Sequence, residues 1–469
     1  MNNNNNTNPS KEPLKNKKEP IPKTAQVMAI TPEIQVINDF NKVYTTLVHS
    51  GKNYVLRLNT DAFGHSFLEF FSQKEFIDAH RDAPKIQVIV NATNGPVVKE
   101  LNPAKIWIES PDSSSSKHGI TFYPKKTKFH KGKFNAYMGR GCEPVQSTKD
   151  DVSTYLKHVF NVICNGDKKS YEYVIKWLAH LFQKPQEKPE VAIVLKAGQG
   201  TGKGTFVDPI GKIIGAHYLY AQSPEQVIGK FNAQLENKLL VFADEFFAGS
   251  KGSTDRLKTM ITEKVGSIER KGQDRISVPC FARIIMATNH ENVIKIERDE
   301  RRYLYLEVSD KHKQDSDYFR QLHQLLAESD FASKLLNYLL KLDISDFEPR
   351  QVPKTKELTA QKIDNLEPLD KWAYTFLKHG EIAGAWPTRL PASKMISHAE
   401  EWLESNALTK FVWGDLPTKA GKLLSQLGLK KFKPGAKNGE KRVGWYDIPT
   451  LEVMRENFNE HINADLDWE

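Results

Sequence analysis

Residues 191 to 205 constrain the fold of this chain more than any other segment. An apolar run that ends at Leu195 has the composition of a buried strand, and it leads into a glycine-rich turn that ends in Gly202-Lys203. Glycine adopts positive φ without strain, so the backbone N–H groups of such a turn can converge on an anion. A helix that begins here adds its positive dipole end, and Lys203 reaches the β- and γ-phosphates of a nucleotide. The segment therefore predicts a phosphate-binding loop.

The loop departs at two positions from the pattern G-x-x-x-x-G-K-[ST]. Ala197 stands at the first glycine, and Gly204 stands where a hydroxyl would bind magnesium. We expect Thr205 to supply that hydroxyl directly or through a water. An ordinary glycine-rich turn is the alternative. The residues expected to bind ATP are Gly198, Gly200, Thr201, Gly202, Lys203, Gly204 and Thr205.

A second apolar run, residues 238 to 245, fits a buried parallel strand that ends in two carboxylates. If this strand lay beside the loop strand, Asp244 would reach the magnesium ion together with Thr205, and Glu245 would polarise the attacking water. Two acids at a strand end are also common where the end is simply solvated. The acid pair supports an ATPase only in combination with other motifs.

Two further strands carry polar groups at their ends. Asn289 follows the apolar run 281 to 288, and Arg301 and Arg302 precede the run 303 to 308. The amide would orient the attacking water, and one arginine would act on the γ-phosphate held by a neighbouring subunit. The order of loop, acid pair, amide and arginine pair on successive strands predicts an ATPase that works between subunits.

Residues 186 to 310 resemble the ring-forming superfamily 3 helicases of the AAA+ class. The likeness is greatest to the helicase module of phage primase-helicase and primase-polymerase proteins, whose phosphate loop is commonly of the Gly-Gln-Gly-Thr-Gly-Lys-Gly-Thr type. The resemblance implies an AAA+ P-loop fold with a parallel sheet core. It also assigns Lys203 and Thr205 to the first motif, Asp244 and Glu245 to the second, and Asn289 to the sensor. Arg301 or Arg302 becomes the arginine finger.

The resemblance also implies a DNA-gripping β-hairpin before the sensor strand. Residues 267 to 277 fit it, with Gly272 at the tip and Arg270, Lys271 and Arg275 around it. From the residues alone, a basic tip between short strands is more often a solvated turn.

Length and composition indicate the number of domains, the kind of partner and the cellular compartment. At 469 residues it is long enough for about three domains, and its net charge of +9 favours a polyanionic partner. Three distant cysteines indicate a reducing compartment, and no stretch is apolar enough to span a membrane. We expect a protein of the bacterial host cytoplasm whose residues 1 to 25, rich in asparagine and lysine, are disordered.

Residues 26 to 150 read as a small α+β domain with strand patterns at 54 to 58, 105 to 108 and 119 to 123. These residues hold no Asp-x-Asp or Asp-x-Glu pair, so a primase would be a separate protein. Residues 125 to 134 interleave five lysines with aromatic residues, as single-strand-binding surfaces do. A solvated loop explains that segment equally well.

Helical patterns flank the ATPase motifs. Residues 169 to 183 predict a lead-in helix, and residues 319 to 342 predict one or two helices. The ATPase domain is therefore placed at 151 to 345, and a linker containing Pro349 and Pro353 at 346 to 368.

Residues 369 to 469 carry the pattern of a winged helix. Three helices are expected at 369 to 378, 393 to 405 and 417 to 427, followed by two short strands joined by a turn. Nine basic residues and two acids lie between Leu408 and Trp445. The groove-facing and backbone-facing residues are expected to be Lys419, Lys422, Lys431, Lys433, Lys441 and Arg442. A basic domain that mediates only protein contacts is the alternative.

Together these patterns predict an ATP-dependent replicative DNA helicase of a phage or mobile element. It would use ATP and Mg²⁺, form a homo-hexamer, and bind single-stranded and duplex DNA through its ring channel and its winged helix. Two other functions fit the same motifs: an AAA+ loader that remodels complexes without unwinding, and an origin-binding initiator with weak ATPase activity.

Overall fold

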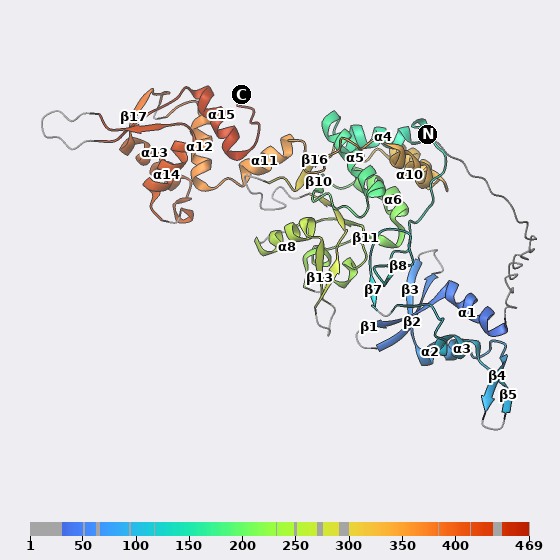
Figure 1. The fold of residues 1–469 in the computed structure, drawn as a ribbon. Coiled ribbons are helices and arrows are strands. Elements are labelled where there is room, and N and C mark those ends of the chain that lie inside the picture. Colours follow the sequence, from blue (N-terminus) through green and yellow to red (C-terminus); the bar gives the residue numbers. More distant parts are fainter. Residues whose placement is uncertain are drawn as a thin grey trace, which may run out of the picture. The chain divides into compact units, whose positions relative to one another are not determined.

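The computed structural model describes two compact units. Unit 1 comprises the described residues of Met1–Thr46 and Phe71–Ser114, and unit 2 those of Leu47–Phe70 and Ser115–Glu469. Figure 1 shows their helices and sheets. The described residues are 31–49, 52–61, 66–92, 95–116, 118–230, 232–247, 251–269, 275–289, 300–382, 384–412, 414–434 and 443–468. The predicted disordered tail lies outside them.

A five-stranded parallel sheet forms the centre of unit 2, which confirms the predicted α/β class with a parallel sheet. Its order is β11 (Tyr218–Ala221), β12 (Leu240–Ala243), β15 (Arg283–Thr288), β10 (Ala192–Lys196) and β16 (Tyr303–Glu307). Asp244 was placed at the magnesium ion on the condition that the acid strand β12 lies beside the loop strand β10. That condition is not met, because β15 pairs with both strands and lies between them.

Alternate side chains of this sheet enter two separate cores. Ile193 and Leu195 of β10 pack with helices α5 (Lys168–Gln183), α6 (Lys203–Ile214) and α10 (Phe331–Lys341). Ala192 and Val194 face the opposite core, with α7 (Glu225–Ile228), α8 (Lys251–Thr262) and α11 (Lys356–Asp364). All four side chains are fully buried. Burial on both faces explains why the strands read as continuous apolar runs.

The elements around the sheet agree only partly with the sequence patterns. The lead-in helix is confirmed as α5, and the region after β16 holds two helices, α9 (Ser316–Ala327) and α10. Before α5, helix α4 (Ser153–His158) continues into a π-helical turn, Val159–Ile163. The residues expected to be a linker contain α11, because Leu358 packs into the second core.

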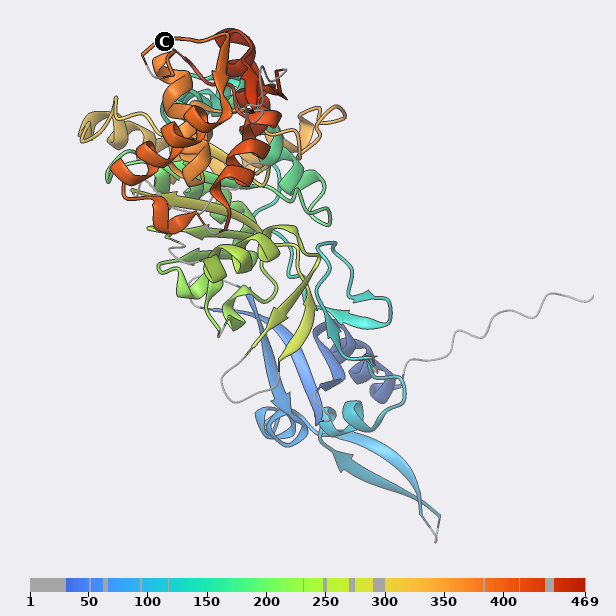
Figure 2. The same cartoon turned by 90° about the vertical axis from the view of Figure 1, so that its left-hand side faces the viewer.

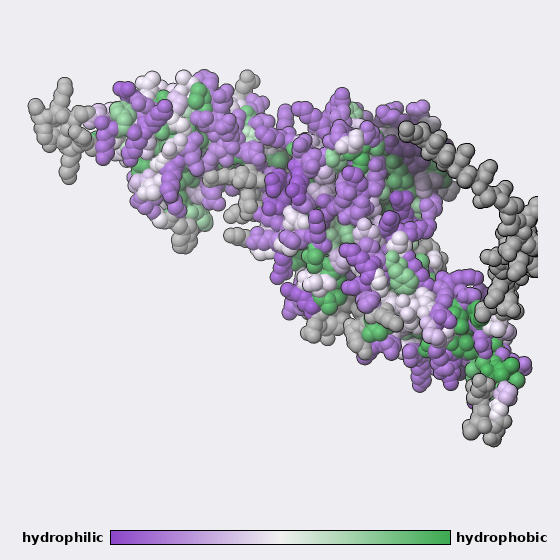
Figure 3. Space-filling model, viewed as in Figure 1, coloured by the Kyte–Doolittle hydropathy of each residue, from purple (hydrophilic) through white to green (hydrophobic). Residues whose placement is uncertain are grey.

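Unit 1 contains helices α1 (Pro32–Val43), α2 (Gln73–Ala79) and α3 (Pro103–Glu109) and a hairpin of β4 (Ile86–Ala92) and β5 (Gly95–Leu101). Residues 105 to 108 were predicted as a strand, but they form α3. The Asn102 side chain caps that helix by accepting from Ala104 N–H, and Pro103 occupies its first turn. Figure 2 shows the hairpin extending from this unit, and Figure 3 shows hydrophobic surface on it, where Ile89 and Val98 are exposed.

Smaller sheets complete the chain. One has the order β3 (Ser66–Ser72), β2 (Lys52–Thr60), β1 (Tyr44–His49) and β6 (Ser115–Ser116). Another contains β7 (Ile120–Thr121), β9 (Lys133–Asn135) and β8 (Phe129–His130). Strands β13 (Val265–Ile268) and β14 (Ile276–Pro279) pair as the predicted hairpin, whose tip lies outside the described residues. Among the described helices, none is long and apolar enough to cross a bilayer.

The C-terminal residues form a helical region with a small antiparallel sheet. Its helices are α12 (Pro368–His379), α13 (Ala392–Ser405), α14 (Leu416–Gln426) and α15 (Leu451–Ile462). The sheet has the order β17 (Arg389–Pro391), β19 (Trp445–Asp447) and β18 (Lys430–Phe432). The three predicted helices and two strands are confirmed, whereas β17 and α15 were not predicted. Three residues are too short a span for strand periodicity to register β17.

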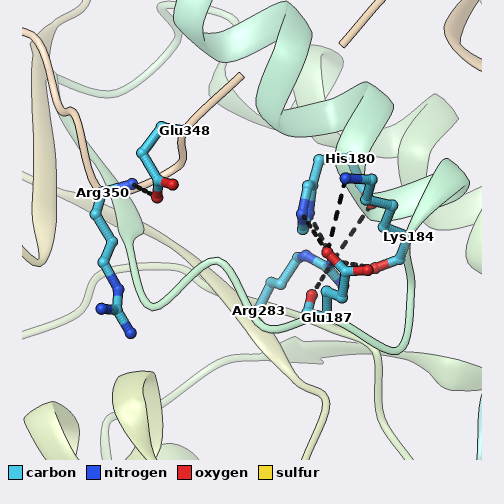
Figure 4. A network of polar contacts seen from close by, with 6 residues as sticks. All are labelled: His180, Lys184, Glu187, Arg283, Glu348 and Arg350. Carbon is cyan, nitrogen blue, oxygen red and sulfur yellow. Dashed lines mark hydrogen bonds and ion pairs between the residues drawn. The ribbon is translucent and has the colours of Figure 1, made fainter. Parts of the chain in front are cut away.

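Arg283 holds the amino-terminal end of β15 against the end of α5 (Figure 4). Its buried Nη2 donates to the carbonyls of Lys184 (3.1 Å) and Glu187 (2.7 Å) and contacts His180 Nδ1 (3.1 Å). Burial lowers the pKa of this guanidinium to about 9. The Arg283 side chain thus donates to backbone oxygens at the carboxyl end of α5 and in the turn that follows it.

Replacing Arg283 with alanine should destabilise the sheet strongly. The change removes hydrogen bonds to the Lys184 and Glu187 carbonyls and leaves a cavity where the buried side chain was, so we expect a loss of about 2–4 kcal/mol. Urea denaturation followed by tryptophan fluorescence measures it. The control is Arg350→Ala, which removes an exposed arginine paired with Glu190 and should cost at most about 1 kcal/mol. Equal destabilisation by the two changes would contradict this role for Arg283.

Candidate nucleotide-binding site

The glycine-rich turn joins β10 to α6 with the backbone that the sequence predicts. Gly200 and Gly202 have φ values of 73° and 93°, in the left-handed region that glycine tolerates. Gly202 caps α6, so the helix begins at Lys203. Ala197 N–H donates to Thr288 O of the neighbouring strand (2.9 Å), which fixes the start of the turn. The N-terminus of α6 therefore opens at the carboxyl edge of the sheet.

A cavity of about 610 Å³ lies over this edge. It gathers residues from the turn, from the ends of β12 and β15, and from α9. The residues that line it are Gln199, Gly200, Thr201, Gly202, Lys203, Gly204, Thr205, Asp208, Asp244, Glu245, Thr288, Asn289, Gln314, Ser316, Phe319 and His323. The turn, the acid pair and the amide, which were chosen from separate stretches of sequence, thus meet at one cavity.

The Lys203 side chain folds back onto the backbone of the glycine-rich turn. Its ammonium donates to the carbonyls of Ala197 (3.1 Å) and Gly198 (3.0 Å). Burial lowers the pKa of Lys203, and the nearby carboxylates of Asp244 and Glu245 oppose that shift. The two carboxylates favour the charged form of the half-buried Lys203 ammonium. A charged ammonium is the form that would bind phosphate.

The acid pair sits on a constrained turn at the end of β12. Asp244 N–H donates to Ala221 O (3.0 Å), and the Tyr220 hydroxyl donates to Asp244 Oδ2 (2.8 Å). Glu245 has a φ of 52°, which costs a non-glycine residue of the order of 1 kcal/mol. After it, Phe246 N–H donates to Ala287 O of the neighbouring strand β15 (2.9 Å). The surrounding bonds hold Glu245 in a strained conformation at the cavity rim.

Thr205 and Asp208 face the same cavity from the first turns of α6. The Thr205 hydroxyl lies 3.1 Å from His323 Nε2 of α9. The pKa of Asp208 is raised by burial. Sequence reasoning missed Asp208 and His323. Helical spacing from Thr205 signals Asp208, which lies three residues further on, whereas nothing in the sequence indicates that a residue 118 positions away packs there.

His158 contacts the backbone of the glycine-rich turn. Its buried ring contacts Gly202 O through Nε2 (3.2 Å) and the Tyr318 hydroxyl through Nδ1 (2.9 Å). Burial lowers the pKa of His158 to about 4, so the ring is neutral at pH 7. A neutral ring has one N–H, which donates from Nε2 to the carbonyl, while Nδ1 accepts from the tyrosine. Residues of α4 and α9 thus both support the glycine-rich turn.

The predicted arginines lie at the opposite edge of the sheet. Arg302 O accepts from Ala192 N–H at the start of β10, about 15 Å from the loop for a five-residue strand. The Arg302 guanidinium contacts the buried carboxylate of Glu300 (3.2 Å), and Arg301 is exposed. Within one chain, neither arginine belongs to the cavity.

The predicted DNA-contacting residues are only partly described. Arg275 pairs with Glu269 (2.8 Å) at the β13–β14 hairpin. Five predicted residues are exposed on the described surface: Arg275, Lys419, Lys422, Lys431 and Lys433. On α14, the buried face is Ala420, Leu423 and Leu424, so both of its lysines point away from the core. Arg270, Lys271, Lys441 and Arg442 lie outside the described residues.

Comparisons with known proteins relate the chain to a phage replication protein. Residues 195–302 match a protein family of unknown function, DUF5906. Over 278 residues the chain is 26% identical to the DNA primase-polymerase of Nitratiruptor phage NrS-1, covering 58% of this chain and 36% of that relative. The chain thus matches just over a third of the relative's length.

Solved structures extend the likeness to most of the chain. Two apo structures of the NrS-1 C-terminal region superpose with TM-scores of 0.62 and 0.61 at 17% identity. They cover 89% and 88% of this chain and 99% of theirs. At that identity the comparison establishes a shared fold.

Acidification should destabilise the protein over a defined pH range. Burial lowers the pKa of His158 and of His217 to about 4, and Met138 N–H donates to His217 Nε2, a bond that protonation would break. Unfolded histidine titrates near 6.5, so stability is complete above pH 6.5 and falls as the pH drops toward 4. At pH 5 each ring should cost up to about 2 kcal/mol.

Thermal unfolding between pH 7.5 and pH 5 measures this effect. A His217→Asn variant should lose less stability on acidification than the native chain, because one of the buried titrating rings is gone. A Tm that stays constant down to pH 5 would contradict the neutral assignment.

Proposed function

We propose that this chain is an ATP-driven DNA helicase that acts as a ring in the replication of a phage or mobile element. The observation that carries the proposal is the convergence of Lys203, Asp244, Glu245 and Asn289 on one cavity at the carboxyl edge of a parallel sheet. A phosphate-binding cation, a metal-binding carboxylate, a base and a water-orienting amide are the components that ATP hydrolysis needs.

The strand order supports placement among AAA+ ATPases of superfamily 3. The amide strand β15 lies between the loop strand and the acid strand, so water held by Asn289 stands between the phosphates and Glu245. The paired strands β13 and β14 precede β15, where the proposed DNA-gripping hairpin belongs. The relation to a phage primase-polymerase favours a role in phage replication. We propose that the chain acts in the host cytoplasm, beside a separate primase.

The residues present fit ATP with magnesium. Positive φ at Gly200 and Gly202 frees backbone N–H groups for phosphate, and the Thr205 hydroxyl and Asp244 carboxylate both line the cavity. Magnesium, when bound there, would neutralise charge on the phosphates. Lys203 would exchange its two carbonyl partners for phosphate oxygens. Glu245 would take the proton of the attacking water.

The position of the arginine pair fits a site shared between subunits. Arg301 and Arg302 lie too far from their own cavity to reach a γ-phosphate there. In a ring, arginine fingers of this type act on the nucleotide of the adjacent protomer. We therefore propose a homo-hexamer in which Arg301 or Arg302 completes the neighbour's site.

The C-terminal region fits a winged helix. Its element order runs α12, β17, α13, α14, β18, β19, and the segment between β18 and β19 would be the wing. Helix α14 presents Thr418, Lys419 and Lys422 to solvent, as a recognition helix does. We propose that this region binds duplex DNA at an origin.

Two substitutions test the ATPase site. Lys203→Ala should abolish ATP binding, whereas Glu245→Gln should bind ATP and lower turnover at least a hundredfold, because general-base catalysis is lost. Fluorescent-nucleotide binding and phosphate release measure the two effects. Lys311→Ala, an exposed lysine outside the cavity, is the control. Normal turnover in either site variant would refute the site.

Forked-DNA unwinding then separates a helicase from a loader or an initiator. The native chain should displace a strand only with ATP, and Glu245→Gln should not. ATP hydrolysis without displacement would identify a loader. Loss of all DNA binding on deletion of residues 369 to 469 would identify an initiator.

Tyr220 should tune magnesium through Asp244. Removing its hydroxyl frees Asp244 Oδ2 from a fixed orientation, and outer-shell changes typically cost ten- to a hundredfold in metal affinity. Because Tyr220 is partly exposed, we expect Tyr220→Phe to raise the Mg²⁺ concentration needed for half-maximal ATP binding about tenfold.

Titration of fluorescent ATP binding against Mg²⁺ measures this shift. Metal-free nucleotide binding should stay unchanged. Tyr218→Phe, on the same strand, is the matched control and should leave the titration as in the native chain. An unchanged midpoint for Tyr220→Phe would show that Asp244 needs no such support.

A further inference from the structure

Five exposed lysines surround a small sheet that the proposed ATPase does not use. The sheet contains β7, β9 and β8, and we call residues 123 to 134 the basic platform. No acidic residue occurs between Tyr123 and Cys142. The platform lysines, all of them exposed, are Lys125, Lys126, Lys128, Lys131 and Lys133.

A single buried side chain fixes the shape of the platform. Asn135 donates through its amide to the carbonyls of Tyr123 (2.9 Å), Lys125 (2.9 Å) and Thr127 (3.1 Å). Its side-chain oxygen accepts from Tyr123 N–H (2.9 Å). These bonds turn the backbone oxygens inward and leave the lysine side chains outward. A merely solvated loop has no need of such a clamp.

The platform is also anchored to the core of unit 2. Phe122 and Ala136, which flank it in sequence, are buried in the first core. The Tyr123 ring meets Phe281 edge-on, with ring centroids 6.1 Å apart. The charged surface therefore sits on rigid elements, which reduces the entropy lost when a ligand binds.

The tip of the platform holds a lysine where the backbone disfavours it. Lys131 and Gly132 form the two-residue turn between β8 and β9, with φ values of 49° and 76°. Such turns favour asparagine followed by glycine. A lysine in the first position costs stability and puts a charge on an exposed turn, which points to a function for the charge.

Aromatic rings lie among the charges. Phe129 is 38% exposed and meets Phe134 edge-on at 6.2 Å, with Lys128 Nζ 5.9 Å from the Phe129 ring centre. His130 stacks on Tyr123 at 3.9 Å with an interplanar angle of 11°. Cations alone would serve any polyanion. An exposed ring among them suits unpaired bases, which stack on aromatic faces while phosphates contact lysines.

We infer that the basic platform is a binding site for single-stranded nucleic acid, separate from the β13–β14 hairpin and from the C-terminal region. Phosphates contact the lysines, and a base stacks on Phe129 or extends the stack of His130 on Tyr123. The site needs no nucleotide hydrolysis. It goes beyond the proposed motor, because it would hold a strand whether or not ATP is turned over.

The test measures binding of fluorescent oligothymidine by the full chain without nucleotide, over a range of salt concentrations. Each phosphate contact on single strands contributes about 0.7 to the slope of log affinity against log salt. Replacing Lys125, Lys126 and Lys133 with glutamine should lower the slope by about 2 and the affinity at least tenfold. Phe129→Ala should lower affinity about tenfold with little change in slope.

Matched variants separate the platform from net charge and from folding. Replacing Lys149, Lys168 and Lys169 with glutamine removes the same charge from other exposed positions and should leave binding nearly unchanged. Lys131→Asn places the favoured residue in the turn, so it should keep or raise Tm while it lowers the salt slope by about 0.7.

Three outcomes would overturn the inference. Equal losses of oligothymidine affinity in the two triple variants would show that the strand is attracted only by the net charge of the chain. Unchanged oligothymidine binding in the platform triple would refute the site and leave an acidic protein partner as the alternative. A loss confined to duplex DNA, with no effect of Phe129→Ala, would exclude base stacking. ATP turnover without DNA is measured in parallel, so failure of the proposed ATPase is seen separately.

Discussion

The burial of the parallel sheet on both faces is the constraint on which the candidate site depends. Strands β10, β12 and β15 send alternate apolar side chains into two cores, so their interiors can hold no charge. Polar chemistry is confined to the ends of the strands. Because parallel strands end at the same edge, Lys203, Asp244 and Asn289 meet there although they are far apart in sequence.

Helices outside the sheet make that edge rigid. His158 and His323 contact the turn and the first residues of α6, and both come from segments that precede or follow the motif residues. Glu245 is kept in a left-handed conformation by bonds on either side of it. Strain and bracing of this kind are typical of sites that must keep a fixed geometry before the substrate arrives.

Charge elsewhere in the chain is presented by rigid supports of two kinds. On α14 a fully buried apolar face leaves Lys419 and Lys422 on the solvent side. On the basic platform the same result comes from Asn135, whose amide collects carbonyls that would otherwise face water. In both places, buried residues determine where the lysine side chains are exposed.

The sequence by itself determined the turn, the strands and most helices, because glycines, apolar runs and helical spacing act over a few neighbouring residues. It thereby identified Lys203, Asp244 and Asn289 individually. Only the tertiary structure decided that β15 lies between β10 and β12, that Tyr220 and His323 hold Asp244 and Thr205, and that Asn135 shapes the platform. Those pairings join residues that are not neighbours in the chain, and local propensity carries no information about which separate segments pack together.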